Sequence, residues 1–193
     1  MCNDYGNEVA YAEYAEALRQ LAMPIQAPSA ASNLEPRRDI WPTETAPVFR
    51  RHEGGVELAQ LRWGFPPASV KGRVVINFKS EGRSFAKSRR CIVPASYFFE
   101  FKGTKTPKEK YRFTLNGEPW FCFAGLWRPA SDDKRESFTL LTTAPGPDVA
   151  PIHNRQMVVL RRDQWKAWLD LTASEAELLA PLPAGSLEVE RVR

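Results

Sequence analysis

The second residue of this chain is a cysteine with distinctive chemistry once the methionine before it is removed. Loss of Met1 leaves Cys2 with a free α-amine and a thiol on adjacent carbons. Such an amine has a pKa of ~7.7–8 and a cysteine thiol one of ~8.5, so both are partly usable at neutral pH. An aldehyde condenses with the amine to a Schiff base, and the thiolate then closes on the imine carbon to give a thiazolidine. The alternative is a cysteine that follows Met1 by chance.

Glu100 is a second candidate for chemistry, because it is the only acid in the apolar run VPASYFFEF. Desolvation among aromatic side chains is expected to raise the pKa of a carboxyl, which suits a general acid/base that works near neutral pH. Strand alternation places Glu100 on one face with Phe98 and Ser96. The alternative is a surface residue on an edge strand.

Two more polar residues stand where chemistry is common. His153 lies in the Pro- and Gly-rich segment APGPDVAPIHNRQM, which predicts a loop that could carry a catalytic group or serve structure alone. His52, in RRHEGG, is expected at an exposed hairpin turn. Asn77 ends the run RVVIN, where an amide can fix a ligand hydroxyl or carbonyl, although Asn is also a usual turn former.

Length and composition predict one domain over residues 1–193 of a soluble protein. No apolar run approaches the ~18 residues of a membrane span, and the first 21 residues hold three Glu and one Asp, so we expect no signal peptide and a cytoplasmic location. Cys91 and Cys122 lie in apolar runs and are expected to be small buried hydrophobes. Neither a disulfide framework, nor a metal site, nor a cofactor is indicated, and we expect a monomer.

The basic charge is concentrated in one segment. Residues 71–112 hold 12 Lys and Arg against 3 Glu, a balance of +9, whereas the other residues hold 15 basic and 20 acidic side chains. Aromatic residues are interleaved with this block. Phosphate attraction combined with planar groups for unpaired bases suits a single-stranded nucleic-acid surface. A solvated basic face over an aromatic core is the alternative.

Periodicity predicts an α+β fold whose core is a mainly antiparallel, curved or barrel-like sheet with a few peripheral helices. A helix is expected over residues 8–22, and a Pro-rich arm over residues 25–44 in which Arg37, Arg38 and Trp41 could face a ligand. Asp163 is expected to cap a further helix, and Ser174 with Glu177 forms a capping box for the next. Turns are expected at Glu53-Gly54-Gly55 and Asn116-Gly117, and strands over residues 46–51, 56–63, 73–78, 89–101, 111–115, 120–126, 138–143, 157–161 and 187–192.

The order of several motifs resembles one known family. The motifs are Met1-Cys2, WGF at Trp63, IN at Asn77 with Glu81 soon after, RRCIVPASYFFEF from Arg89 to Phe101, AGLW, TTAP and IHNRQM around His153. Together they resemble the SRAP family, the SOS-response-associated peptidase or abasic-site processing proteins, and they span nearly the whole chain.

The resemblance implies that Cys2, exposed by loss of Met1, bonds covalently to the ring-opened aldehyde of an abasic site in single-stranded DNA. Asn77, Glu100 and His153 match the family's active-site residues, and lyase and autoproteolytic activity are further implications. The family's fold is a β-rich core with peripheral helices, and its DNA channel is basic and aromatic. The predicted DNA-binding residues are Lys79, Arg83, Arg89, Arg90, Trp63 and Arg38.

The chain departs from the family pattern at three positions near the site. Asp4 stands where the family has an arginine thought to hold a phosphate, Lys79 replaces an arginine and loses its bidentate fork, and Phe101 replaces a tryptophan. The catalytic set is retained, and phosphate binding beside it is expected to be weaker. Two other functions stay open: a cysteine peptidase or N-terminal-nucleophile amidohydrolase, and a non-catalytic nucleic-acid-binding barrel.

Overall fold

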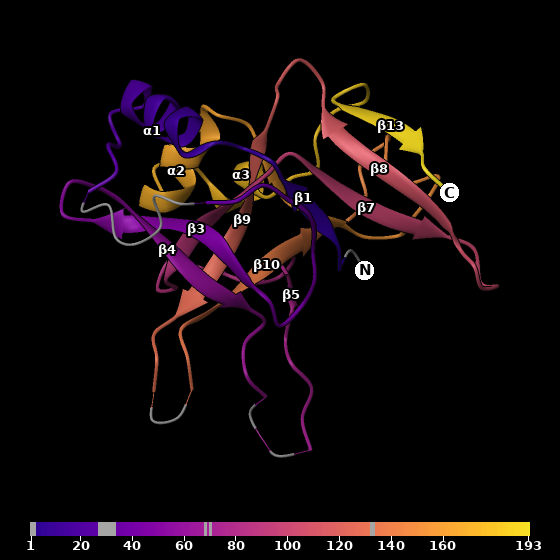
Figure 1. Ribbon diagram of the computed structural model, residues 1–193, viewed down its shortest axis with the longest axis horizontal. Helices are drawn as coiled ribbons and strands as arrows, with labels where there is room; N and C mark the ends of the chain where they lie inside the picture. The colour runs from indigo at the N-terminus through magenta and orange to yellow at the C-terminus, as the bar shows by residue number, and fades with distance from the viewer. Residues whose placement is uncertain (1–2, 27–33, 68, 70, 132–133) are drawn as a thin grey trace.

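The computed structural model describes residues 3–26, 34–67, 69, 71–131 and 134–193. Strands are the main regular secondary structure in this part of the chain, with short helices at the periphery (Figure 1). No helix among the described residues has the length and apolar character needed to cross a membrane. The elements are β1 (Tyr5–Asn7), α1 (Tyr11–Gln20), β2 (Arg37–Ile40), β3 (Thr45–His52), β4 (Gly55–Trp63), β5 (Asn77–Lys79), β6 (Arg90–Ala95), β7 (Tyr97–Lys102), β8 (Glu109–Leu115), β9 (Phe121–Arg128), β10 (Ser137–Thr143), β11 (Gln156–Met157), β12 (Val159–Leu160), α2 (Gln164–Asp170), α3 (Glu175–Leu178) and β13 (Leu187–Arg191).

The strands form two sheets. The first has the order β13-β8-β7-β1-β2, and the second has the order β11-β10-β4-β3-β6-β9-β12, with β5 paired to β10. Because β10 also pairs with β9, strands β10, β4, β3, β6 and β9 close into a ring. Between the described strands, β10 runs parallel to β4 and β5, and the other pairings are antiparallel. The predicted fold class is confirmed.

Side-chain alternation along the second sheet builds two cores. On β6, Ile92 faces the core under the three helices, whereas Cys91 and Val93 face the core shared with the first sheet. On β9, Cys122 faces the helices and Phe123 faces the first sheet. This alternation puts the two cysteines on opposite faces, both buried with free thiols, as their apolar surroundings predict.

The β3–β4 hairpin forms at the predicted turn. Glu53 and Gly54 have φ values of 34° and 81°, the left-handed region that a tight reversal requires. The pairing places Arg50 directly opposite Glu57, and the Arg50 Nε donates to Glu57 Oε2 at 2.8 Å. His52 ends β3 beside this turn, with its imidazole partly exposed.

The predicted strand over residues 89–101 is wrong as one element, because it divides at Ser96 into β6 and β7, which belong to different sheets. The backbone N–H of Ser96 donates to the carbonyl of Gly6 at 2.8 Å, and its hydroxyl accepts from the N–H of Glu8 at 3.0 Å. The chain thereby leaves one sheet and joins β1 of the other. Apolar alternation continues through this point and does not reveal the change of partner.

Other boundaries also differ from the predictions. The expected strand over residues 73–78 is reduced to β5, and the expected helix over residues 8–22 is confined to α1. The arm expected over residues 25–44 includes β2, which pairs with β1. Sequence pattern missed β2 because three of its four residues, Arg37, Arg38 and Asp39, are charged, and the strand is ordered by pairing.

The remaining turn prediction and the two cap predictions had different outcomes. Gly117 has φ 77°, as a turn glycine requires, but the strands on either side of Asn116-Gly117 lie in different sheets. The Ser174 hydroxyl accepts from the N–H of Glu177 at 3.2 Å and caps α3. Asp163 precedes α2 in a helical conformation and makes no side-chain capping bond, so its predicted role is wrong.

Candidate active site

An open cleft of ≈ 530 Å³ joins the amino-terminal segment to two of the predicted catalytic residues. Cys2 lies outside the described residues, but Asn3, the next residue, lines the cleft together with Glu100 and His153. Trp41 and Phe101 add aromatic surface to the same cleft, and Trp41 had been predicted to face a ligand. The complete lining is Asn3, Trp41, Glu100, Phe101, Gly103, Thr104, Lys108, Ile152, His153 and Asn154.

Glu100 is held in the cleft by the interior of the first sheet. Its strand β7 lies between β8 and β1, and alternation places Glu100 on the same face as Phe98, which stacks on Phe113 in the core. Only 1% of the residue is exposed. The prediction of a buried carboxyl is confirmed, and the alternative of a surface residue on an edge strand is wrong.

His153 approaches Glu100 from the loop between β10 and β11. Its Nδ1 lies 3.8 Å from Glu100 Oε2 and 20% of its side chain is exposed. The same nitrogen lies 2.9 Å from the carbonyl oxygen of Arg155 and 3.1 Å from the Arg155 backbone nitrogen. Burial lowers the pKa of His153, although the hydrogen bond to the Arg155 backbone opposes the shift. The imidazole is therefore predominantly neutral at pH 7.

The loop that carries His153 is fastened by an ion pair that sequence analysis did not assign. The guanidinium of Arg155 donates to both carboxylate oxygens of Glu81, one of them at 2.9 Å, and to Thr142 Oγ1 on β10 at 3.0 Å. Hydrogen bonds from Arg155 lower the pKa of Glu81 to about 2. Glu81 and Arg155 both lie in motifs that resemble the family, which was the available signal, but their pairing across 74 positions was not visible.

Asn77 reaches the same side of the second sheet from β5. It pairs with Leu140 of β10, which belongs to the core shared with the first sheet, and paired residues point to the same face. Glu100 lies on the strand face that borders this core. Among the described residues that line the cleft, however, Asn77 is not included. The structure thus brings Glu100 and His153 together and leaves the role of Asn77 a prediction.

Asp4, which stands where the family has an arginine, is fully buried. Its burial indicates a structural role, whereas the sequence suggested only weaker phosphate binding. Its Oδ2 lies 2.7 Å from the Nζ of Lys110, and that Nζ lies 3.6 Å from the centre of the Phe99 ring. The carbonyl of Asp4 accepts the N–H of Phe99 at 3.0 Å. Desolvation raises the pKa of Asp4 to about 6, although Lys110 opposes the shift. A buried carboxyl on a lysine fixes the amino-terminal segment to the first sheet and does not face a phosphate.

Two predicted DNA-binding residues have structural roles. Trp63 is fully buried, stacks on Phe138, and donates its Nε1 to the carbonyl of Ile76 at 3.0 Å. The Arg90 Nε donates to the carbonyl of Trp168 at 2.9 Å near the end of α2, where carbonyls lack helical partners. Trp63 has no exposed surface and so cannot reach DNA in this fold, whereas Arg90 is partly exposed and its role in DNA binding stays a prediction.

The other four predicted DNA-binding residues are at the surface. Lys79, Arg83 and Arg89 are exposed side chains of the basic segment. Arg38 on β2 has 86% of its side chain exposed, and its Nε lies 3.7 Å from Glu8. Their positions agree with contact to an extended anion, so their role stays a prediction.

The fold and cleft define a class: a β-rich protein in which a buried carboxyl and a neutral imidazole meet beside the amino-terminal segment. The chain belongs to the SRAP family, because the model of SOS response associated peptidases matches residues 1–193. It is 31% identical over 177 residues to the abasic site processing protein YoqW of Bacillus subtilis, with 81% of this chain and 79% of YoqW covered. The abasic site processing protein YoaM of the same organism is 30% identical, with 82% and 78% covered.

Solved structures share the fold. A protein from Bacteroides thetaiotaomicron has a TM-score of 0.77 at 20% identity, covering 100% of this chain and 92% of its own. A protein from Bordetella bronchiseptica has a TM-score of 0.74 at 25% identity, with both chains covered completely. The arrangement of strands and helices is therefore one that other proteins adopt at low sequence identity.

Proposed function

We propose that this protein processes abasic sites in single-stranded DNA by bonding Cys2 covalently to the aldehyde of the ring-opened sugar. The observation that carries the proposal is the 3.8 Å approach of His153 Nδ1 to the buried Glu100 in a cleft lined by Asn3, the residue after Cys2. The names of YoqW and YoaM, abasic site processing proteins, support the substrate. The basic segment of residues 71–112 supports binding of the DNA strand.

The reaction begins when Met1 is removed, by an aminopeptidase or by the protein itself. The Cys2 α-amine adds to C1′ of the abasic sugar to give a carbinolamine, which loses water to form the Schiff base. The thiol then adds to the imine carbon, the nitrogen takes up the proton, and a thiazolidine closes without any oxidant or cofactor. Elimination of the 3′ phosphate from the imine is a side reaction, which gives strand cleavage.

Glu100 is the residue that we assign to proton transfer on the carbinolamine. The carboxyl is 1% exposed and so is shielded from bulk water, and a carboxyl in this position can exchange a proton with a neighbouring amine or hydroxyl. As the hydroxyl of the carbinolamine departs, Glu100 donates the proton that turns it into water. The same carboxyl regains a proton when the amine nitrogen loses one.

His153 is assigned to the sugar ring oxygen. Its Nδ1 is engaged by the Arg155 backbone, 2.9 Å from the carbonyl oxygen and 3.1 Å from the nitrogen, which leaves Nε2 to face the substrate, and in the imidazolium form Nε2 carries the proton that is transferred. Protonation of the ring oxygen opens the sugar and exposes the aldehyde. The Arg155–Glu81 ion pair keeps the imidazole in place during this step.

A denaturing gel tests the proposal. Protein lacking Met1 is mixed with single-stranded DNA that carries one abasic site, and a band that survives denaturation and heating is expected. The matched control is Cys2→Ser, which keeps the amine and cannot close a thiazolidine, so its conjugate should require reduction by borohydride to survive. DNA binding without any covalent band would favour the non-catalytic barrel, and hydrolysis of peptides instead would favour the peptidase.

A further inference from the structure

Lys108 brings a primary amine into the active cleft. It lines the cleft together with Glu100 and His153, and it is the only lysine among the described residues that do so. A lysine amine is a nucleophile that forms Schiff bases with carbonyl compounds. Because the proposed substrate carries an aldehyde, this side chain has a reaction partner within the cleft.

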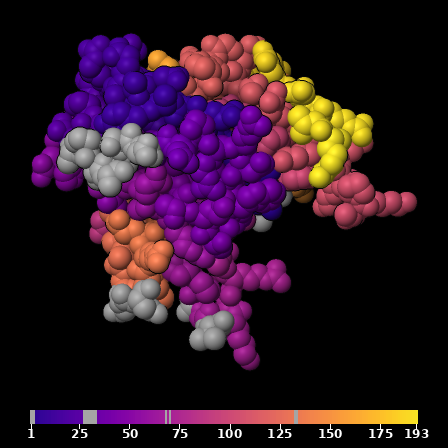
Figure 2. Space-filling model, viewed as in Figure 1, coloured from indigo at the N-terminus to yellow at the C-terminus, as the bar shows by residue number. Residues whose placement is uncertain are grey.

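The fold holds the backbone of Lys108 against the carboxyl-terminal strand. The turn between β7 and β8 projects from the edge of the molecule beside the end of β13 (Figures 1 and 2). Lys108 directly precedes β8, and its carbonyl accepts the Arg193 Nε at 3.3 Å. The backbone of Arg193 exchanges hydrogen bonds with Lys110. The position of Lys108 is therefore set by the sheet and not by the tip of the turn.

The charge of Lys108 acts on the imidazole of His153. Burial lowers the pKa of His153, the hydrogen bond to the Arg155 backbone opposes this shift, and the positive charge of Lys108 adds to the lowering. The charge of an exposed side chain is screened over about 10 Å, so the ammonium group lies near the ring. The Lys108 amine thus shares one space with the two groups that we assign to proton transfer.

Lys108 differs from the lysines near it in sequence. Lys110 is paired with Asp4, at 2.7 Å from its Oδ2. Within the part of the chain that the structure describes, no carboxylate forms an ion pair with Lys108. Lys102 and Lys105 are exposed and do not line the cleft. Of these four lysines, only Lys108 combines a place in the cleft with an amine that no described acid pairs.

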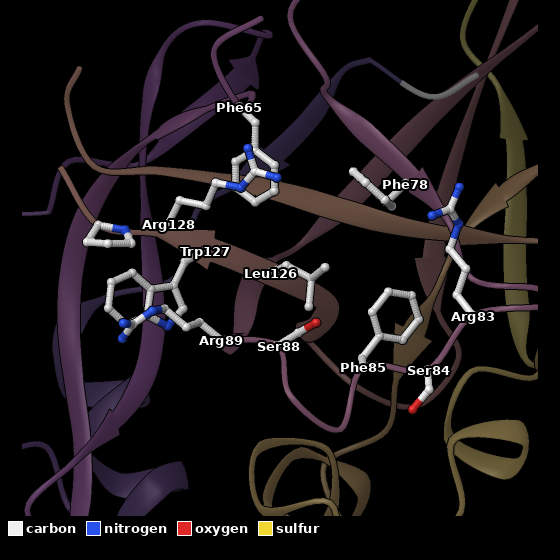
Figure 3. A pocket seen from close by; sticks show the side chains of 11 residues that line it. Phe65, Phe78, Arg83, Ser84, Phe85, Ser88, Arg89, Leu126, Trp127 and Arg128 are labelled. Atoms are coloured by element: carbon white, nitrogen blue, oxygen red, sulfur yellow. The ribbon is translucent and has the colours of Figure 1, made fainter. Parts of the chain in front are cut away.

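A second large hollow of the molecule lacks such an amine. It measures ≈ 490 Å³ and lies between the end of β9 and the segment of residues 83–89 (Figure 3). Its cationic side chains are those of Arg83, Arg89 and Arg128, and no lysine is among its described lining residues. A guanidinium stays protonated and does not attack an aldehyde. Of the two hollows, the active cleft is the one that offers a side-chain amine.

We propose that Lys108 is a second nucleophile of the active cleft, which cleaves the DNA strand at an abasic site without the Cys2 amine or thiol. This inference rests on the proposed function for its substrate and adds an activity with a different nucleophile. The neutral Lys108 Nζ adds to C1′ of the ring-opened sugar, and the carbinolamine loses water to give the imine. Because lysine has no thiol beside its amine, this imine cannot close to a thiazolidine.

Elimination is the forward reaction that remains for the Lys108 imine. A base removes a proton from C2′, the electron pair moves toward C3′, and the 3′ phosphate leaves. His153 accepts that proton at Nε2 when its Nδ1 donates to the Arg155 carbonyl oxygen at 2.9 Å. Water then hydrolyses the conjugated imine and releases Lys108. The products are one strand that ends in an unsaturated aldehyde and one that begins with a 5′ phosphate, and the sequence consumes no oxidant or reductant.

The test uses the full chain with an uncleavable residue ahead of Cys2, which we call the blocked protein and which cannot form the thiazolidine. It should cleave single-stranded DNA that carries one abasic site faster than the same DNA breaks when incubated alone. Borohydride added at the start should trap a covalent conjugate, and peptide mapping should place the adduct on Lys108. Without borohydride the imine hydrolyses, so no conjugate survives. An adduct on the new amino terminus or on another lysine would overturn the proposal.

Two substitutions in the blocked protein separate nucleophilic from electrostatic action. Lys108→Arg keeps the positive charge but cannot form the imine, so it should lose the trapped conjugate and the strand cleavage, as should Lys108→Gln. Lys108 is exposed, so both variants should fold. The matched control, Lys105→Gln, removes an exposed amine from the same turn and should keep both the conjugate and the cleavage. Cleavage by Lys108→Arg at the rate of the blocked protein would mean that only the charge matters and would overturn the proposal.

The wild-type protein with Met1 removed separates this inference from the proposed function. Crosslinking by that protein, with no cleavage by the blocked protein, would count against the role of Lys108 alone. Cleavage by the blocked protein, with no heat-stable conjugate from the protein that has a free Cys2, would count against the proposed function alone. Absence of both reactions would overturn both.

Discussion

Replacing Asp4 by asparagine tests whether the segment after Cys2 is anchored by a buried carboxyl. Asp4 has no exposed surface and contacts Lys110 Nζ at 2.7 Å. Its surroundings raise its pKa from 3.8 to about 6. Between these two pH values the folded protein binds a proton at Asp4 that the unfolded protein has lost, so the contribution of Asp4 to stability falls as pH rises.

The size of this effect follows from the shift itself. A difference of about two pKa units corresponds to about 3 kcal/mol, at 1.36 kcal/mol per unit. Above about pH 7 the effect is complete, and below about pH 3 it is absent. Asparagine does not titrate, so the free energy of unfolding of Asp4→Asn should rise relative to the wild type by up to about 3 kcal/mol between pH 3 and pH 7.

The assay is urea unfolding of both proteins across this range, with the difference in free energy as the readout. Titrating groups that do not interact with Asp4 cancel in that difference. Lys110→Met provides the second arm: loss of the cation should raise the pKa of Asp4 further and move the titration to higher pH. A difference that stays constant with pH would mean that the ion pair balances desolvation, and one that falls as pH rises would mean that the ion pair outweighs it; either would refute the reasoning.

Three further predictions concern the cleft. Glu100→Gln keeps the shape of the carboxyl but cannot transfer a proton, so crosslinking should slow by ~10²–10⁴-fold in a time course of conjugate formation; wild-type rates would exclude Glu100 as the proton donor. His153→Ala should slow both formation and release of the conjugate. Because burial lowers the pKa of His153, the ratio of wild-type to variant rates should grow as pH falls below about 6.5. A ratio that does not change with pH would mean that His153 has only a structural role. Glu81→Gln frees Arg155 and should slow crosslinking less than Glu100→Gln does, with Glu81→Asp recovering part of the rate; no change in rate would remove the positioning role of the ion pair.

The sequence pattern predicted the features of the fold that are determined by residues close together in the sequence. The turn at Glu53-Gly54-Gly55 forms because Glu53 and Gly54 adopt positive φ, and the burial of Glu100 follows from alternation with Phe98. The cysteines are buried for the same reason. In each case the residue's own neighbours in sequence determine the outcome, so no knowledge of distant partners was needed.

Distant partners decided the features that sequence did not reveal. A charged residue is predicted to be exposed as long as its hydrogen-bond acceptor is unknown. The acceptor of the Arg90 Nε is the carbonyl of Trp168, which is 78 positions away in the sequence. The same holds for the burial of Asp4 against Lys110. Trp63 looked available to DNA because aromatic composition cannot show that its N–H is already satisfied by Ile76. Composition located the basic segment, and only the fold showed which of its side chains make intramolecular contacts and which are exposed.

The account depends most directly on the free α-amine of Cys2, and intact-protein mass spectrometry tests it. Protein with Met1 removed is incubated with abasic single-stranded DNA, alongside the same protein with an uncleavable residue ahead of Cys2 that leaves folding and reversible DNA binding unchanged. The account predicts a conjugate whose mass equals protein plus DNA minus one water for the first protein and no conjugate for the second. Equal amounts of that conjugate from both would contradict it.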